Sequence, residues 1–195
     1  VKLWGFTTEK YRVPDKAERD AVIKKIDYKK IELLPNCQVQ IPSGMAIDLG
    51  AAAKGYLSQK IIDLCKEKKV ASCILSLGGN VQTIGMKPDD TEYTVGITDP
   101  SDGSSIYGTV KVKDKAVITS GIYQRNFKKN GKLYHHIMDK RTGMPADNNL
   151  ASVTVIAENG AMADAYATAL SVMGEEKAIA FQKKHPQIQI ILIRK

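Results

Sequence analysis

Apolar residues recur at intervals of three and four along one long stretch of the chain. They stand at Ala53, Leu57, Ile61, Leu64 and Cys65. This spacing gives a helix one apolar stripe, so the stretch predicts an amphipathic helix over residues 51–68. Further helices are predicted over residues 161–173, over 175–184, and over 15–26, where Asp15 and Glu18 have the spacing of a capping box.

Shorter apolar stretches, bounded by Gly, Pro or Asn, predict β-strands. Asn130 and Gly131 stand between two of them, and this dipeptide is typical of a hairpin turn. The order of elements indicates an α+β fold with a largely antiparallel sheet flanked by helices. We expect one domain over residues 1–195, since no repeat or linker interrupts the pattern. The predicted strands cover residues 39–41, 45–49, 72–77, 81–86, 93–98, 106–112, 116–119, 125–128, 132–137, 151–157 and 187–193.

The composition is that of a globular protein, because 43% of the 195 residues are apolar and 26% are charged. No apolar run approaches the roughly 18–20 residues that cross a bilayer. The chain begins at Val1 without an initiator Met or the pattern of a signal peptide. We therefore expect a truncated or processed chain whose compartment the sequence does not identify.

The net charge of +8 suits an acidic partner, but the lysines form many short groups rather than one basic surface. Aromatic residues are few and do not alternate with the basic ones, as a surface for single-stranded nucleic acid requires. The pattern therefore favours solvated helix faces and turns over nucleic-acid binding.

The three cysteines, Cys37, Cys65 and Cys73, lack the close spacing of a metal site. Their odd number argues against a full disulfide framework. Cys65 and Cys73 stand among apolar residues, where a free Cys is usually a small core residue. We expect all three to be structural.

Residues 47–56 join a predicted strand to a predicted helix through a run of small residues. We expect Asp48 to end the strand and the helix to begin at Gly50 or Ala51, where free N–H groups and the helix dipole favour an anion. Lys54, one turn into the helix, is placed to reach a phosphate as a point charge. The alternative is that Asp48 only caps the helix and that Lys54 is solvated.

Asp164 and Thr168 are four residues apart and share one face of a predicted helix. Carboxylate and hydroxyl oxygens suit Mg²⁺, which takes few protein ligands and completes its coordination with water and phosphate. The same pair is also commonplace in helices that bind nothing.

His135 and His136 end a predicted strand, and alternation sends them to opposite faces, so that one of them faces a site. Asp139, Arg141 and Thr142 follow in a polar turn. A His beside an anion-binding turn suits proton transfer or the stabilisation of a phosphoryl group. An ordinary surface or core His is the alternative.

Three further segments carry candidate ligand contacts. Ser120 and Gly121 stand at a strand end, with a hydroxyl and an N–H group for a ligand. Residues 78–80 form a Gly-Gly-Asn turn that lacks the spacing of a dinucleotide fingerprint or a P-loop. The aromatic rings of residues 4–6 suit stacking on an aromatic ligand. Each also has an ordinary reading as a turn or as packing.

Taken in order, these segments resemble the flavin transferase family, the FAD:protein FMN transferases also called ApbE proteins. The resemblance spans nearly the whole chain and implies an ApbE-like, T-fold-like architecture. The matching residues are 3–6, 47–50, 53–56, 77–80, 119–121, 134–137, 141–143, 150–155, 163–164 and 168–169, with Tyr123, Arg125 and Asp139.

The resemblance implies an enzyme that cleaves FAD at its pyrophosphate with Mg²⁺, passes FMN to a Thr or Ser hydroxyl of a target protein, and releases AMP. It implies that His136 activates the acceptor hydroxyl. Family members are often exported and lipid-anchored, and some are cytoplasmic. The implied metal ligands are the Ala51 carbonyl, Asp164 and Thr168, and the expected FAD contacts are Asp48, Lys54, Met138, Ser120, Gly121, Trp4, Gly5 and Phe6.

Three departures from the family pattern stand out. Ala51 replaces the second Gly of the usual Asp-Leu-Gly-Gly, and Lys140 replaces the usual Pro after Asp139. Family members also begin well upstream of Trp4, in a lobe that normally supplies part of the FAD pocket.

Two other functions are compatible with the same residues. One is an FAD pyrophosphatase that releases FMN and AMP, since water competes with any acceptor hydroxyl. The other is a flavin-binding module without turnover. The presence of Asp164, Thr168 and His136 favours catalysis over binding alone.

Overall fold

The computed structural model describes residues 1–195, which form two compact units. Unit 1 comprises residues 1–48 and 127–147, and unit 2 comprises residues 49–126 and 148–195. Each unit is therefore built from two separate stretches of the chain. The single domain expected over residues 1–195 stays a prediction.

Unit 2 is built on a five-stranded sheet in which neighbouring strands are antiparallel. The strand order is β13-β12-β7-β4-β3, so that β7 joins the β3–β4 hairpin to the β12–β13 pair. This arrangement confirms the expected α+β fold with a largely antiparallel sheet. The strands are β3 (Cys73–Leu77), β4 (Asn80–Ile84), β7 (Ala116–Gly121), β12 (Leu150–Ala157) and β13 (Gln189–Arg194).

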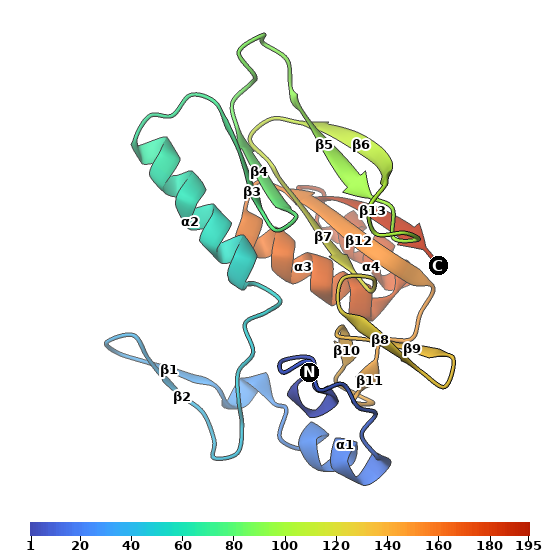
Figure 1. The fold of residues 1–195 in the computed structure, drawn as a ribbon. Helices are drawn as coiled ribbons and strands as arrows, with labels where there is room; N and C mark the ends of the chain where they lie inside the picture. Colours follow the sequence, from blue (N-terminus) through green and yellow to red (C-terminus); the bar gives the residue numbers. More distant parts are fainter. The chain divides into compact units, whose positions relative to one another are not determined.

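Three helices cover one face of this sheet (Figure 1). Alternation along β7 and β12 directs Ile118, Val153 and Val155 toward α3, where they pack with Ala163 and Ala167 in a buried apolar core. The small side chains of α3 let its backbone approach the sheet closely. Asp164 on α3 therefore lies beside residues of the strands. The helices are α2 (Ala53–Glu67), α3 (Gly160–Met173) and α4 (Glu175–Lys184).

A two-stranded ribbon packs on the opposite face of the sheet (Figure 1). It consists of β5 (Tyr93–Thr98) and β6 (Ile106–Val112), which are antiparallel. Its Val95 and Ile97 form a second apolar core with Val117 and Ile156, whose neighbours in sequence face the helices. The central strands β7 and β12 are therefore covered on both faces, which fixes the strand β7 that carries Ser120.

Unit 1 consists of short elements and an aromatic cluster. Trp4 packs on Tyr134 with ring centroids 5.4 Å apart, and Phe127 stacks on Tyr134 at 5.3 Å. Phe6 lies 5.7 Å from Phe127. The elements are η1 (Lys2–Trp4), α1 (Lys16–Ile23), η2 (Tyr28–Lys30), β1 (Glu32–Leu34), β2 (Gln38–Gln40), β8 (Asn126–Lys129), β9 (Lys132–His135), β10 (Met138–Asp139) and β11 (Met144–Pro145).

Most predicted elements are present within two residues of their expected ends, and the clearest exceptions lie in unit 1. The prediction of a strand over residues 45–49 is wrong, and so is the prediction that Asp48 ends a strand. The reason is pairing: β2 takes β1 as its partner, a strand that the sequence did not indicate. The helix expected over residues 15–26 has its capping box but ends at Ile23.

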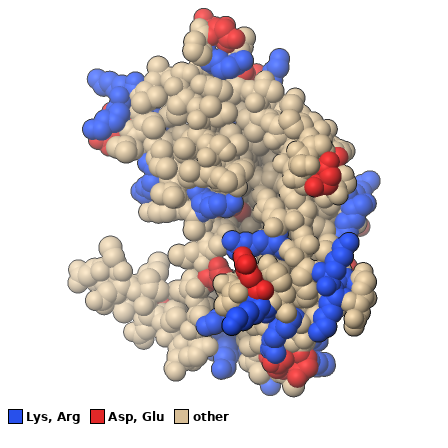
Figure 2. Space-filling view, viewed as in Figure 1, with Lys and Arg blue, Asp and Glu red and all other residues tan.

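The surface shows no single basic patch on the face drawn in Figure 2. Lys and Arg side chains occur there in several separate groups, with acidic side chains among them. This distribution agrees with the short lysine groups of the sequence. No helix in the structure has both the length and the apolar character to cross a membrane.

Glu175, the first residue of α4, is half-buried and supports a test of the fold. Its carboxylate accepts hydrogen bonds from Arg194 Nη2 at 2.6 Å and from the Asn149 side chain at 2.7 Å. Arg194 first, and then Asn149, lower the pKa of Glu175 from 4.5 to about 2. Because the charged form is the stabilised one, its contribution is present above pH 4.5 and is lost as the pH falls from 4.5 toward 2.

We therefore expect Glu175→Gln to lower the thermal unfolding temperature slightly at pH 7 and progressively less at pH 4 and pH 3. Circular dichroism melts at the three pH values measure this difference. Glu176→Gln is the matched control, since Glu176 is also in the first turn of α4 but has no such partners. A Glu175→Gln effect that stayed constant from pH 7 to pH 3 would contradict the argument.

Candidate functional site

Asp164 is the buried acidic residue of the candidate site in unit 2. It lies on α3, is 5% exposed, and accepts a hydrogen bond on Oδ2 from the Gly55 backbone N–H at 2.7 Å. Burial raises the pKa of this carboxyl, whereas the Gly55 hydrogen bond, the charge of Lys54 and the Asn80 amide lower it. A buried carboxylate is costly unless a cation compensates it, so this position suits a positively charged ligand.

The approach of α2 to α3 depends on Gly55. A Cβ at this position would lie 2.4 Å from the Gly160 carbonyl oxygen and 2.5 Å from the Asp164 Cβ. Side chains do not tolerate such distances, so only Gly allows its N–H to reach the carboxylate. One turn further on, the buried Ser58 hydroxyl donates to the Gly55 carbonyl at 3.0 Å.

Lys54 and Asn80 approach the same carboxylate from two other elements. Lys54 Nζ donates to the Gly78 carbonyl at 3.3 Å, so the start of α2 is joined to the turn after β3. Asn80, the first residue of β4, is 1% exposed, and its amide nitrogen makes no hydrogen bond of ordinary geometry. The amide nevertheless lies close enough to the Asp164 carboxylate to lower its pKa, so it belongs to the surroundings of that carboxylate.

Thr168 lies one turn after Asp164 on the same helix. Its hydroxyl oxygen is 3.0 Å from that of Ser120 and 3.4 Å from the Asp164 carbonyl oxygen. The end of β7 and the middle of α3 thus bring two predicted site residues together. Gly121 follows on β7, where a Cβ would lie 2.2 Å from the Tyr123 ring, so this Gly is required by packing. Its contact with FAD stays a prediction.

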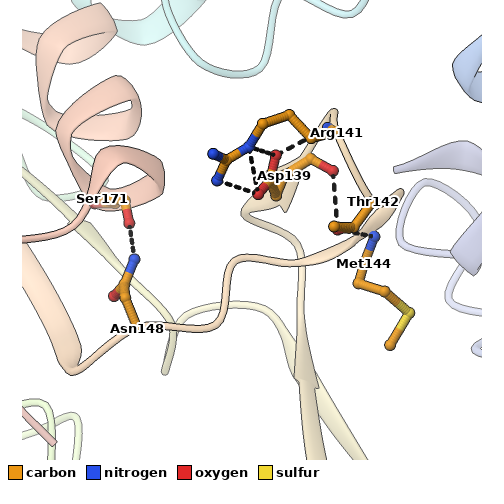
Figure 3. Close-up of polar contacts among 6 residues, drawn as sticks. All are labelled: Asp139, Arg141, Thr142, Met144, Asn148 and Ser171. Carbon is orange, nitrogen blue, oxygen red and sulfur yellow. Dashed lines mark hydrogen bonds and ion pairs between the residues drawn. The ribbon is translucent and has the colours of Figure 1, made fainter.

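Helix α3, which carries Asp164 and Thr168, is anchored at both ends. At its start, Asn159 Oδ1 accepts a hydrogen bond from the Met162 N–H at 3.0 Å. Near its end, the Asn148 side chain donates to the Ser171 carbonyl at 2.8 Å (Figure 3). Fixed ends hold the interior turn, so Asp164 and Thr168 keep one orientation.

The oxygen donors of unit 2 fit a magnesium ion. No group of three or more His, Cys, Asp or Glu side chains in residues 1–195 is arranged to hold a metal. Ala51 precedes α2, which begins at Ala53, so the Ala51 carbonyl lies outside that helix. One carboxylate, one hydroxyl and one carbonyl suit Mg²⁺, which keeps water and phosphate ligands of its own. The buried carboxylate of Asp164 is the donor that most needs a cation.

In unit 1, His135 and His136 differ in burial. His135 ends β9 and is buried, whereas His136 follows it and is half-buried. The His136 ring faces Phe6 edge-on, with ring centroids 6.3 Å apart. His136 is therefore the more accessible of the two, and its role as the base stays a prediction.

Trp4, Gly5 and Phe6 belong to the packed part of unit 1. Trp4 is 1% exposed and its Nε1 donates to the Gly143 carbonyl at 2.9 Å. Gly5 has a φ of 81°, and a Cβ there would lie 2.0 Å from the Lys10 carbonyl oxygen, so no other residue fits. Within unit 1, this segment has the ordinary packing role, and its contact with a flavin stays a prediction.

The polar turn after His136 is organised by Asp139. Its carboxylate accepts hydrogen bonds from Arg141 Nη2 at 2.6 Å, Arg141 Nε at 3.0 Å and the Arg141 backbone N–H at 2.9 Å (Figure 3). This hydrogen bonding raises the pKa of the Arg141 guanidinium. Thr142 continues the turn, because its Oγ1 accepts a hydrogen bond from the Met144 N–H at 3.2 Å. The Arg141 charge is thus engaged inside the turn. Met138 lies just before it, on β10.

The structure divides the predicted site residues between the units. Lys54, Asp164, Thr168 and Ser120 lie close together in unit 2. Asp48 lies in unit 1 and is exposed; burial lowers the pKa of the Val1 amino group, and the Asp48 charge partly offsets this. Unit 2 also contains Ala51 and Gly121, and unit 1 also contains Trp4, Gly5, Phe6, His136 and Met138.

Sequence reasoning gave Gly55 no role of its own, and it treated Asn80 only as part of the candidate turn over residues 78–80. A Gly inside a helix costs about 1 kcal/mol relative to Ala, so Gly55 on its own was a sign of a close backbone approach. Asn80 follows two glycines with positive φ, which turn the chain so that the Asn side chain enters the interior. Its neighbour Asp164 is 84 positions away (164 − 80), which no local pattern reveals.

Comparison with known proteins finds one family. The family model described as the ApbE family matches residues 1–192. An FAD:protein FMN transferase of Treponema pallidum is 36% identical over 209 residues, covering 99% of this chain and 58% of the relative. Another, of Klebsiella pneumoniae, is 36% identical over 198 residues, covering 100% of this chain and 61% of the relative.

Solved structures show the same architecture. The crystal structure of an ApbE protein from Thermotoga maritima has a TM-score of 0.89 and 33% identity, over 99% of this chain and 64% of that one. The apo form of the flavinyl transferase ApbE from Pseudomonas stutzeri has a TM-score of 0.85 and 27% identity, over 100% of this chain and 60% of that one. The ApbE-like architecture is thereby confirmed. The chain spans about six-tenths of the length of these proteins.

Proposed function

Since this chain belongs to the ApbE family, we propose that it transfers FMN from FAD to a Thr or Ser hydroxyl of an acceptor protein and releases AMP. The relatives named FAD:protein FMN transferase support the reaction class. The observation that carries the proposal to particular residues is the buried Asp164 carboxylate, held by Gly55 beside Lys54, Asn80 and Thr168. This cluster suits a ligand that combines a divalent cation with phosphates.

Asp164, Thr168 and the Ala51 carbonyl are the proposed ligands of Mg²⁺. When bound, this ion neutralises negative charge on the pyrophosphate and on the departing AMP. The chain itself supplies the orientation: the Gly55 N–H holds one oxygen of the Asp164 carboxylate, and Ser120 lies against the Thr168 hydroxyl. Both ligands therefore start from fixed positions, which lowers the entropy lost on binding.

The start of α2 is the proposed anion site. No side chain caps this 15-residue helix, whose positive dipole end carries Lys54 in its first turn. Lys54 donates to the Gly78 carbonyl, which places its ammonium group at the Gly78–Asn80 turn. A phosphate here would meet the Lys54 charge and the positive end of the helix dipole. Met138, Ser120, Gly121, Asp48 and the segment 4–6 are the further FAD contacts that we propose.

His136 is the proposed base for the acceptor hydroxyl. It takes the hydroxyl proton as the acceptor oxygen forms a bond to the phosphorus of the FMN moiety, and the phosphoanhydride bond to AMP breaks. A phosphoester replaces the phosphoanhydride, and the proton then leaves His136 for solvent. Neither an oxidant nor a second nucleotide is needed, so the chain, FAD, the acceptor and Mg²⁺ suffice.

The proposal is tested by incubating the 195-residue chain with FAD, Mg²⁺ and an acceptor peptide that carries a Thr. Mass spectrometry then measures peptide-linked FMN and AMP, with a parallel reaction in EDTA. We expect both products in equal amounts, and neither in EDTA. If AMP and free FMN appeared without labelled peptide, the reaction would be hydrolysis and not transfer. If FAD bound but no product appeared, the chain would be a flavin-binding module.

Replacing His136 by Ala is expected to lower the rate of FMN transfer roughly 100-fold or more, because general-base catalysis contributes about that factor. FAD binding, measured by quenching of flavin fluorescence, should change little. His185→Gln is the control, since that His stacks on Phe181 in unit 2, with ring centroids 4.1 Å apart. Unchanged transfer by the His136→Ala protein would remove the base assignment.

A further inference from the structure

The helix α2 and the strand β3 run side by side in opposite directions. At one end, Lys54 on α2 donates to the Gly78 carbonyl just after β3. At the other end, the Val70 N–H donates to the Cys65 carbonyl at 2.9 Å and reverses the chain before β3 begins at Cys73. The end of the helix therefore lies beside the beginning of the strand.

Helical spacing directs Cys65 toward the sheet. Ser58 and Ile62 are buried residues of α2, and Cys65 continues their spacing of four and then three. Cys65 is half-buried, whereas its neighbour Leu64 is 51% exposed. The thiol of Cys65 therefore belongs to the inward face of the helix.

Strand register directs Cys73 toward the helix. Leu75 pairs with Gln82 of β4, whose buried side chain lies against Gln59 of α2. Cys73 is two residues before Leu75 and so faces the same side of the sheet. It is also half-buried.

The two inward faces bring the thiols of Cys65 and Cys73 into contact. Burial first, and then the charge and hydrogen bonding of the Cys65 thiol, raise the pKa of the Cys73 thiol. Both cysteines are reduced in this structure, and the third, Cys37, is exposed in unit 1. The sequence predicted only small structural residues at all three positions.

We propose that Cys65 and Cys73 form an intrachain disulfide when the protein meets a low-molecular-weight disulfide such as oxidised glutathione. The thiolate of one cysteine attacks the small disulfide, forms a mixed disulfide and expels one glutathione thiolate. The thiolate of the other cysteine attacks the protein sulfur of that bond and expels the second glutathione. Two protein thiols are oxidised, one glutathione disulfide is reduced, and the two protein protons pass to the two expelled glutathione thiolates.

This bond links α2 to β3 at the end opposite to Lys54 and Gly78. The same two elements carry Lys54 and lead into Asn80, so the bond would restrain a helix–strand pair that supports the candidate site. It would close a short loop, residues 65–73, and restrict the unfolded chain. We expect the oxidised protein to unfold at a higher temperature than the reduced protein, and a reductant to reverse the shift.

The test treats the Cys37→Ser protein with oxidised glutathione, blocks remaining thiols with N-ethylmaleimide, and digests the protein with trypsin under non-reducing conditions. Lys66, Lys68 and Lys69 lie between the two cysteines, so trypsin places them on separate peptides. We expect most of the protein to yield one linked pair of peptides that separates on reduction. Peptides carrying glutathione or the maleimide instead would overturn the proposal.

The matched control moves one thiol by a single position. Adding Leu64→Cys and Cys65→Ser to the Cys37→Ser protein places the thiol on the exposed face of α2. This protein should yield glutathione-modified or blocked Cys73 and at least tenfold less linked peptide. If both proteins gave equal amounts of linked peptide, the short loop over residues 65–73 would be enough to bring the thiols together. The inward orientation of Cys65 and Cys73 would then not be the cause, and the argument would be overturned.

Discussion

Asp164→Asn is expected to abolish Mg²⁺-dependent FMN transfer, with a loss of at least 100-fold in rate. The substitution removes the only acidic donor of the proposed magnesium site while keeping an oxygen that can accept the Gly55 N–H. Loss of a group that merely supports a metal ligand costs roughly 10–100-fold, and loss of a ligand should cost more. Initial rates over a series of Mg²⁺ concentrations, followed by AMP release, measure the effect.

The same variant should be more stable than the parent protein when Mg²⁺ is absent. Burial raises the pKa of Asp164 above 3.8, so the folded state opposes ionisation more than the unfolded chain does. The penalty is therefore absent below pH 3.8, grows as the pH rises from 3.8 to the raised pKa, and is fully present above it. Thermal melts in EDTA at pH 7 should show a higher unfolding temperature for Asp164→Asn.

Added Mg²⁺ should raise the unfolding temperature of the parent protein but not that of Asp164→Asn, because a ligand stabilises only the state that binds it. Asp63→Asn is the control, since Asp63 is an exposed residue of α2 whose carboxylate accepts a hydrogen bond from Gln59. It should respond to Mg²⁺ as the parent does. Equal responses of the parent and Asp164→Asn would show that Asp164 does not bind the ion.

Gly55→Ala is expected to destabilise unit 2 and to impair transfer together. An exposed helical Gly→Ala change gains up to about 1 kcal/mol, but a new methyl group here would lie 2.4 Å from the Gly160 carbonyl oxygen. Relief requires α2 to move away from α3, and such overpacking costs typically about 1–3 kcal/mol. The shift also lengthens the Gly55–Asp164 hydrogen bond. Urea unfolding measures the first effect and AMP release the second.

Gly108→Ala is the matched control for Gly55→Ala. Gly108 lies on β6, and a Cβ there would have no atom within 4 Å. Because Gly weakens a strand interior by roughly 0.5–1 kcal/mol relative to Ala, this substitution should be neutral or slightly stabilising. If both Gly→Ala variants behaved alike, the close approach of α2 to α3 would not be the cause.

Local signals explain why many elements were predictable. The capping box at Asp15, the Asn130–Gly131 turn and the apolar spacing of α2 all act within a few residues, so they predicted α1, the β8–β9 hairpin and α2 without knowledge of the rest of the chain. The strand predicted over residues 45–49 failed because a strand needs a partner, and β2 pairs with β1 instead. Which partner a strand takes is not written in its own residues.

For the candidate site too, some features follow from the sequence and others only from tertiary packing. The sequence by itself determined the α+β fold, most helices and strands, and, through a family resemblance, candidate residues such as Lys54, Asp164 and Thr168. Only the tertiary structure decided that the Gly55 N–H binds Asp164, that the Asn80 amide lies beside it, and that two cysteines meet at the α2–β3 contact. Those contacts depend on how closely separate elements pack, which is set by the volumes and burial of many side chains at once.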